Sequence, residues 1–173
     1  MLRILGQSLR IGVVTEAAPI DAELAALGAA LRRRLDARFG RSLAIRQVDA
    51  GSCNGCELEI RALTNPYHDV ERFGVHFVAS PRHADVLLVT GPVSRHMAAA
   101  LRRTWRAVPA PKWVIAAGSC ACDGGEFGAS YASCGAVANV IPVDLRIPGC
   151  PPSPLTLLRG LLALLASAGD GEP

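Results

Sequence analysis

Two cysteines separated by two residues lie in a short loop, Gly51-Ser52-Cys53-Asn54-Gly55-Cys56-Glu57. Two thiolates at this spacing can bind one metal centre from a single turn of the chain. Gly51 and Gly55 lack a Cβ, so backbone N–H groups beside them can approach inorganic sulfur closely. A pair of this kind alone is compatible with zinc, a redox disulfide or an iron–sulfur cluster.

Two further cysteines stand in similar surroundings and strengthen the metal interpretation. Cys120 lies beside Gly118 in Gly-Ser-Cys-Ala-Cys-Asp-Gly-Gly, and Cys150 follows Gly149 in Pro-Gly-Cys-Pro-Pro. Four thiolates from separate loops suit either structural zinc or a 4Fe–4S cluster. Zinc sites in small domains usually combine two close pairs, whereas here one pair is joined by two single cysteines. The spacing therefore favours one 4Fe–4S cluster with four ligands: Cys53, Cys56, Cys120 and Cys150.

Two cysteines remain, Cys122 and Cys134. Free cysteines are often buried, so we expect both to pack as small hydrophobic residues. Cys122 lies two residues from Cys120 and could compete with it as a ligand. Because five neighbouring thiols around one cluster would be unusual, we assign the ligand to Cys120.

The composition limits the class of protein. The 173 residues predict one domain with a sizeable core, and half of them are apolar while only 19% are charged. This balance indicates apolar surface that partners cover. A net charge of +3 is too small to argue for nucleic-acid binding. Six cysteines in a chain of this length do not resemble a secreted disulfide framework, and we expect neither a signal peptide nor a transmembrane segment, which together predict a reducing cytoplasmic setting.

Strands and helices are expected to alternate along the chain. Asp21 is a candidate cap for a helix over residues 22–38, and Gly40 would end it. Its arginines form either a solvated face or a docking surface for an acidic partner or a membrane subunit. Strands are predicted over residues 42–48, 75–78, 86–90, 113–117 and 141–145. Further helices are predicted over residues 56–63, 97–107 and from Pro154 after a Ser153 cap; residues 128–138 are expected to be partly helical, and 9–14 to form a short strand or an arm.

This alternation predicts an open, parallel α/β sheet with helices on both faces, close to a flavodoxin-like fold. Each cysteine loop follows a different predicted strand. In open α/β sheets, ligands bind outside the carboxyl ends of the strands, so these loops should meet at one edge. We expect residues 1–41 to form an N-terminal arm and basic helix, 42–168 the cluster domain and 169–173 a tail.

With these motifs in place, the chain resembles the small-subunit family shared by nickel–iron hydrogenases and respiratory complex I. Four stretches carry the resemblance in order: residues 53–57, 90–94, 118–125 and 148–154. Within the family, the chain is most similar to small subunits of group 4, membrane-bound, energy-converting hydrogenases of the formate hydrogenlyase type. The stretch of residues 72–85 also resembles that branch. The two-residue gap between Cys53 and Cys56 is the hydrogenase spacing, whereas the complex I branch places these cysteines adjacent.

The resemblance implies a flavodoxin-like fold that carries the single 4Fe–4S cluster nearest the active site, on the four cysteines named above. It also implies that Gly91, Pro92, Val93 and Ser94 pack against the cluster. The nickel–iron centre would belong to a separate large subunit docked over this edge, so no catalytic residue is expected in this chain. The chain would pass electrons between that subunit and ferredoxin-like 4Fe–4S subunits. With integral membrane subunits, the complex would lie on the cytoplasmic side of the plasma membrane, where this chain is peripheral.

Two acidic residues follow the first cysteine pair, Glu57 and Glu59. Carboxylates there could relay protons to the partner's site or tune the cluster potential. Glu57 could equally favour the N-terminus of the following helix. In the resembling family an acidic residue at the position of Glu59 belongs to the motif. Two other functions stay open: a complex I-like subunit that passes electrons to quinone or another acceptor without nickel, and a structural zinc module.

Overall fold

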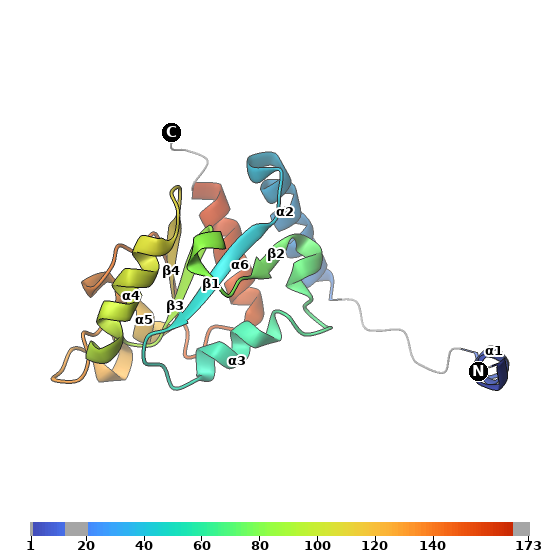
Figure 1. The fold of residues 1–173 in the computed structure, drawn as a ribbon, viewed down its shortest axis with the longest axis horizontal. Coiled ribbons are helices and arrows are strands. Elements are labelled where there is room, and N and C mark those ends of the chain that lie inside the picture. Colours follow the sequence, from blue (N-terminus) through green and yellow to red (C-terminus); the bar gives the residue numbers. More distant parts are fainter. Residues whose placement is uncertain (1, 13–20, 168–173) are drawn as a thin grey trace.

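Five parallel strands form one sheet in the order β2-β1-β3-β4-β5 (Figure 1). The computed structural model describes residues 2–12 and 21–167. This strand order is the flavodoxin-like one, in which the chain winds outward in both directions from the β1–β3 pair. The predicted fold class is thus confirmed. The strands are β1 (Leu43–Asp49), β2 (Val75–Phe77), β3 (Val86–Thr90), β4 (Trp113–Ala117) and β5 (Leu145–Ile147).

Helices cover both faces of this sheet (Figure 1). The first face carries α2 (Ala22–Phe39), α3 (Gly55–Ala62) and α6 (Pro154–Ser167), and the second carries α4 (Arg95–Ala107) and α5 (Ser119–Asp123). Side chains alternate between the faces of a strand, so a strand covered on both sides is expected to be mostly apolar, and four of the five residues of β3 are Val or Leu. The central strand β3 is buried at all five positions. The remaining helical segments are α1 (Leu2–Ile11) and the short turns η1 (Val70–Phe73), η2 (Pro81–His83), η3 (Gly125–Phe127) and η4 (Val137–Asn139).

Helix α2 begins and ends where its sequence predicts. The Asp21 carboxylate accepts hydrogen bonds from the backbone N–H groups of Glu23 and Leu24, at 3.0 and 3.1 Å. Gly40 ends the helix in the left-handed conformation, at φ 60°. The helix packs against α6, and its buried leucines belong to the same core as the first face of the sheet: Leu24, Leu31 and Leu35. Although the sequence assigns residues 1–41 to a segment outside the sheet domain, α2 contributes directly to that core.

The predicted strand over residues 141–145 is displaced. Ile141 closes the η4 turn through a hydrogen bond from its N–H to the Val137 carbonyl, and Pro142 has no N–H to donate. The Asp144 carboxylate instead accepts from the Val114 N–H at 2.7 Å, which holds the chain beside β4 just before pairing starts. Pairing with β4 therefore begins at Leu145.

Two other local predictions hold only in part. Residues 9–11 belong to α1 instead of a strand, and 13–14 lie outside the described residues. Of residues 128–138, expected to be partly helical, only the start of η4 is helical. Gly128 and Gly135 have positive φ there, and Ser133 forms an antiparallel bridge with Ser94. Among the helices of residues 2–12 and 21–167, none has the length and apolar character needed to cross a membrane.

Substituting Leu31 tests whether α2 is part of the domain core. Leu31 is 1% exposed, so Leu31→Ala should lower the free energy of unfolding by about 2–5 kcal/mol. The matched control is Leu58→Ala on α3, where the side chain is 57% exposed and the expected change is within about 0.5 kcal/mol. Urea unfolding followed by circular dichroism measures both. Equal, small effects would instead support a domain that starts after residue 41.

Candidate metal centre

Four cysteines meet at the carboxyl edge of the sheet. The loop after β1 carries two of them, and the loops after β4 and β5 carry one each. Because β1, β3, β4 and β5 are neighbours in the sheet, these loops lie side by side. The loop after β3 adds Gly91 and Pro92 from the middle. All four thiols line a single cavity of about 120 Å³: Cys53, Cys56, Cys120 and Cys150.

Backbone hydrogen bonds fix the loop that carries the first pair. One Asp49 carboxylate oxygen accepts from the N–H groups of Gly51 and Ser52, both at 2.8 Å. The Ser94 N–H donates to the Ala50 carbonyl at 2.8 Å, which joins this loop to the one after β3. Asn54 then takes the left-handed conformation immediately before α3, so Cys56 lies in the first turn of that helix.

The loops of the two single cysteines are joined in the same way. The Gly118 N–H donates to the Ile147 carbonyl, and the Ser119 N–H to the Gly149 carbonyl, both at 2.8 Å. The Gly149 N–H in turn donates to the Ser119 hydroxyl at 3.3 Å. These three bonds couple the positions of Cys120 and Cys150, although 30 residues separate them in the sequence.

Glycines allow the loops to approach more closely than a side chain would permit. A Cβ on Gly118, whose φ is +93°, would lie 2.6 Å from the Cys56 sulfur. A Cβ on Gly91 would lie 2.4 Å from the Ser52 backbone nitrogen. Both distances are too short for a real contact, so the observed packing requires glycine at these positions.

The thiols influence one another electrostatically. Burial raises the pKa of the Cys56 thiol to about 11, and neighbouring Glu57 and the other three cysteines add to this effect. Burial, followed by the charges of Cys150 and Cys53, also raises the pKa of Cys120. These two thiols are therefore protonated at neutral pH without a metal. Because a metal binds the thiolate, metal binding at this site must release protons.

The size of the cavity discriminates between kinds of metal centre. Among the described residues, no three Cys, His, Asp or Glu side chains are arranged to hold a single metal ion. The four cysteines and eight further residues line a cavity of about 120 Å³. A water-sized species needs only about 10–15 Å³ of such volume, so the cavity fits a centre of several atoms. The donor set and the space thus fit a 4Fe–4S cluster better than one zinc ion.

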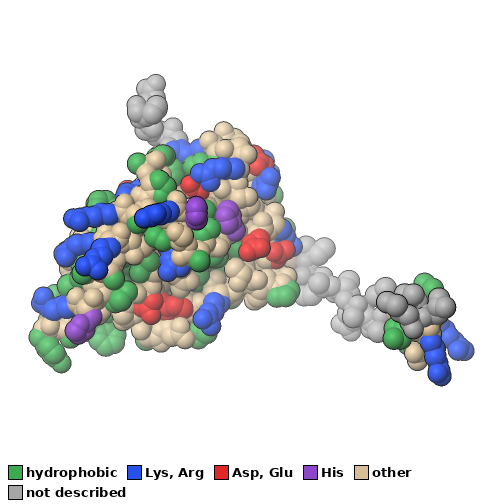
Figure 2. Space-filling view, viewed as in Figure 1, with side chains coloured by type: hydrophobic (Ala, Val, Ile, Leu, Met, Phe, Trp, Pro, Cys, Tyr) green, Lys and Arg blue, Asp and Glu red, His purple; other side chains and the backbone are tan. Residues whose placement is uncertain are grey.

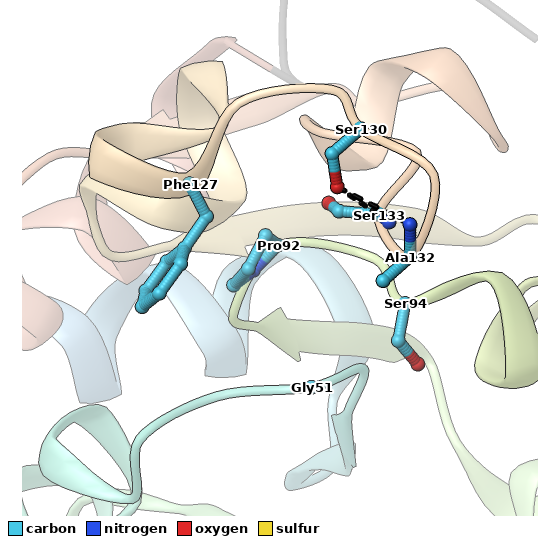
Figure 3. A pocket seen from close by; sticks show the side chains of 7 residues that line it. All are labelled: Gly51, Pro92, Ser94, Phe127, Ser130, Ala132 and Ser133. Carbon is cyan, nitrogen blue, oxygen red and sulfur yellow. Dashed lines mark hydrogen bonds between the residues drawn. The ribbon is translucent and has the colours of Figure 1, made fainter.

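Some of the predicted cluster-contacting residues lie elsewhere. Gly51 and Ser94 line a neighbouring cavity of about 240 Å³ (Figure 3). Figure 3 shows Gly51 on one side of it and the loop with Ser130, Ala132 and Ser133 on the other. Val93 is fully buried in the core of the second face. The cysteine cavity is lined by four of the predicted residues: Gly55, Gly91, Pro92 and Gly149. Gly118 does not line the cavity but packs against the Cys56 sulfur.

Sequence reasoning missed Phe127, which lines both cavities. Phe127 belongs to the turn η3, and its side chain is 64% exposed. Ser52, Ser119 and Pro151 also line the cysteine cavity. The motifs contained these three residues, but only the long-range packing of the loops reveals Phe127.

The two remaining cysteines pack as expected. Cys122 and Cys134 are partly buried against the core of the second face, and neither lines the cysteine cavity. The Cys122 thiol donates a hydrogen bond to the Ala116 carbonyl at 3.4 Å. Burial raises the pKa of Cys122, which keeps it a neutral thiol at pH 7. The Cys122 sulfur thus packs inside the domain and does not face the cysteine cavity.

The two acidic residues differ in their surroundings. Glu57 is only 6% exposed, and one of its carboxylate oxygens accepts a hydrogen bond from the Thr90 hydroxyl at the end of β3. The other oxygen is buried with no hydrogen-bond partner among the described residues. Glu59 is half-buried on the same helix. Glu57 is therefore the more deeply buried of the two acidic residues, and it directly follows the cavity cysteine Cys56.

Comparison with known proteins extends this picture. The family model described as NADH ubiquinone oxidoreductase, 20 Kd subunit, matches residues 53–164. Formate hydrogenlyase subunit 7 of Escherichia coli is 43% identical over 146 residues, which are 84% of this chain and 56% of that protein. The chain thus spans little more than half of that relative. A subunit of the NADH-quinone oxidoreductase of Desulfovibrio desulfuricans is 46% identical over 127 residues, 73% of this chain and 68% of that protein.

A solved structure shares the fold. The membrane-bound sulfane sulfur reductase, an archaeal respiratory membrane complex, contains a chain that matches this one with a TM-score of 0.66 and 34% identity. The match covers 76% of this chain and 73% of that one. The family model, for its part, matches more than half of the residues and includes all four cavity cysteines. The chain therefore belongs to the family of the NADH ubiquinone oxidoreductase 20 Kd subunit, whose members include subunits of hydrogenase and NADH-quinone oxidoreductase complexes.

Proposed function

We propose that this chain is the electron-transfer small subunit of a membrane-associated nickel–iron hydrogenase complex. It holds a single 4Fe–4S cluster next to the active site of a large subunit and relays electrons between that subunit and ferredoxin-like subunits. The observation that carries the proposal is the meeting of four cysteines from three strand ends around one cavity. Family membership supports the role of an oxidoreductase subunit.

The roles of individual residues follow from their positions. When bound, a 4Fe–4S cluster accepts and releases one electron. Cys53, Cys56, Cys120 and Cys150 hold it, and Gly91 and Pro92 shape the cavity between the two halves of the site. Gly149 lines the cavity beside Cys150. The neighbouring Gly51, Val93, Ser94 and Gly118 lie outside the cavity lining and position its loops.

The open side of the cavity supports docking of a large subunit there. Cys53 and Cys150 are exposed, while Cys56 and Cys120 are half-buried. Phe127, which lines the cavity, is 64% exposed. Leu58 on α3 is 57% exposed, and Tyr131, in the loop that lines the neighbouring cavity, is 94% exposed. Exposed apolar side chains of this size are typical of surfaces that a partner covers. A covering subunit would exclude water from the cluster.

The proposed complex also contains integral membrane subunits, with this chain peripheral on the cytoplasmic side. The similar solved structure supports a membrane setting, since it is that of a membrane-bound respiratory complex.

A complex I-like subunit that passes electrons to quinone or another acceptor is the second candidate. Its support is the 46% identity to the NADH-quinone oxidoreductase subunit of Desulfovibrio desulfuricans. The two-residue gap between Cys53 and Cys56 favours the hydrogenase. The sequence of the large subunit encoded beside this chain distinguishes the two: two CxxC pairs, one near each end, mean a nickel–iron centre, and their absence means the second candidate.

Substituting single cysteines tests the cluster and its ligands. Cys150→Ser should strongly reduce iron and acid-labile sulfide per chain after anaerobic purification and abolish the EPR signal of the reduced cluster. Cys122→Ser is the matched control, because a serine hydroxyl can donate the same hydrogen bond to Ala116 and the site is not touched. Zinc without sulfide in the wild type would refute the cluster, and bleaching by Cys122→Ser would refute the ligand assignment.

Substituting Gly118 tests the close approach of the loops. Gly118→Ala places a Cβ 2.6 Å from the Cys56 sulfur, so it should displace this ligand and lower the iron and sulfide content at least twofold. Gly40→Ala is the control: its φ is +60°, but no atom lies within 4 Å of the added Cβ. Gly40→Ala incurs backbone strain of about 1–2 kcal/mol. Gly118, at φ 93° and ψ 150°, lies in a region that is essentially restricted to glycine, so Gly118→Ala adds backbone strain as well as the contact with the thiol. Equal iron contents in the two variants would contradict the role of Gly118.

We propose that Glu57 and Glu59 act on the cluster, by tuning its potential or relaying protons, and that the tuning effect is larger for Glu57. A negative charge near a cluster disfavours added electrons, and burial limits its screening by water. Glu57→Gln should therefore raise the reduction potential measured by EPR-monitored titration. Glu59→Gln should raise it less, since Glu59 is half-buried. A larger rise in Glu59→Gln would reverse this assignment.

A further inference from the structure

Helix α1 (Leu2–Ile11) has an apolar and a basic side. Five of its ten residues are leucine or isoleucine, two are arginine and none is acidic. Arg3 and Arg10 are seven positions apart, so they project from the same side of the helix. They line one shallow hollow with Gly6 and Gln7, which places both arginines and Gln7 on one side of α1. Figure 2 shows the basic side chains of α1 gathered on one side.

Three apolar side chains of α1 face solvent. Ile4, Leu9 and Ile11 are 71%, 86% and 59% exposed. Within the described residues, α1 makes no extensive packing contact with another helix or strand. A helix of ten residues is also shorter than the length of about 12–15 residues at which isolated helices become even marginally stable in water. A surface outside the described chain must therefore cover these side chains for the helix to persist.

The distribution of the apolar side chains indicates what that surface is. A helix that binds a protein groove usually presents one narrow stripe, with anchors three, four and seven positions apart. Ile4 and Ile11 are seven positions apart and keep that spacing, but Leu9 lies five positions from Ile4, about 140° further around the helix and outside a single stripe. The apolar side chains therefore cover a broad arc of the helix, opposite the two arginines. This distribution fits a flat apolar surface with negative charges along its boundary with water. A bilayer with anionic headgroups has both properties.

We propose that α1 lies in the interface of an anionic lipid bilayer, with its apolar arc toward the acyl chains and its arginines at the headgroups. The contact attaches the chain to the membrane without a spanning helix. One short helix binds weakly and reversibly, so α1 orients the subunit on the membrane, and other subunits supply the stable anchor. The proposal depends on residues 2–11 alone and not on the cluster.

Binding of the purified full chain to lipid vesicles tests the proposal. We expect co-sedimentation with phosphatidylcholine vesicles that contain one quarter phosphatidylglycerol, and much weaker binding to pure phosphatidylcholine. Arg3→Glu/Arg10→Glu should weaken binding to the anionic vesicles about tenfold or more, since each reversal replaces attraction to the surface by repulsion. Ile4→Glu/Leu9→Glu should abolish it. Far-UV circular dichroism should show helix gained by the wild type on anionic vesicles and none gained by this second variant.

Two matched controls isolate α1. Arg33→Glu/Arg34→Glu changes the net charge equally on exposed positions of α2, and Leu58→Glu charges an exposed apolar position of α3. Both should bind anionic vesicles like the wild type. Equal weakening by the α2 control, or undiminished binding of Ile4→Glu/Leu9→Glu, would overturn the proposal. Absence of vesicle binding by the wild type would also overturn it and point to a protein partner. Iron and sulfide contents, measured on every variant, should not change, which separates this test from that of the cluster.

Discussion

The candidate metal site depends on one constraint: parallel strands deliver their carboxyl ends to the same edge of the sheet. The cysteine loops belong to strands that are far apart in the sequence, and no local turn could bring Cys53 near Cys150. The order β1-β3-β4-β5 places their loops side by side, with the loop after β3 in the middle. The apolar residues on both faces of β3 therefore determine the position of the thiols as much as the cysteine motifs do.

Close packing imposes a second requirement on the same edge. The loops touch through backbone hydrogen bonds and glycines, and a methyl group at Gly118 or Gly91 would collide with a thiol or with backbone. Burial raises the pKa of the Cys56 and Cys120 thiols, so these two ligands are uncharged in the apo site, where a bound centre would need thiolates. Forming the thiolates in this buried, crowded position is therefore unfavourable, and binding of a positively charged metal centre can offset that unfavourable free energy.

Much of this arrangement is predictable from sequence because the signals are local. Asp21 and Gly40 mark the ends of α2, apolar runs mark β3 and β4, and each cysteine loop follows a predicted strand. The start of β5 is not predictable in this way, because the pairing of Asp144 with β4 is a tertiary interaction. Phe127 escapes prediction for the same reason, since only the packed loops bring its exposed ring to the cavity. Residues 9–11 are compatible with strand or helix, as short apolar segments are.

The hydrogen-bonded loops after β4 and β5 form one half of the site, and the loop that leads into α3 forms the other. A centre bound to all four thiols would join these halves and close a loop from residue 53 to residue 150, more than half of the chain. A cross-link over so long a segment restricts the unfolded chain in the way a disulfide does. The cofactor would then stabilise the fold as a covalent cross-link. Oxygen damage that removes it would shorten the lifetime of the folded protein as well as interrupt electron transfer.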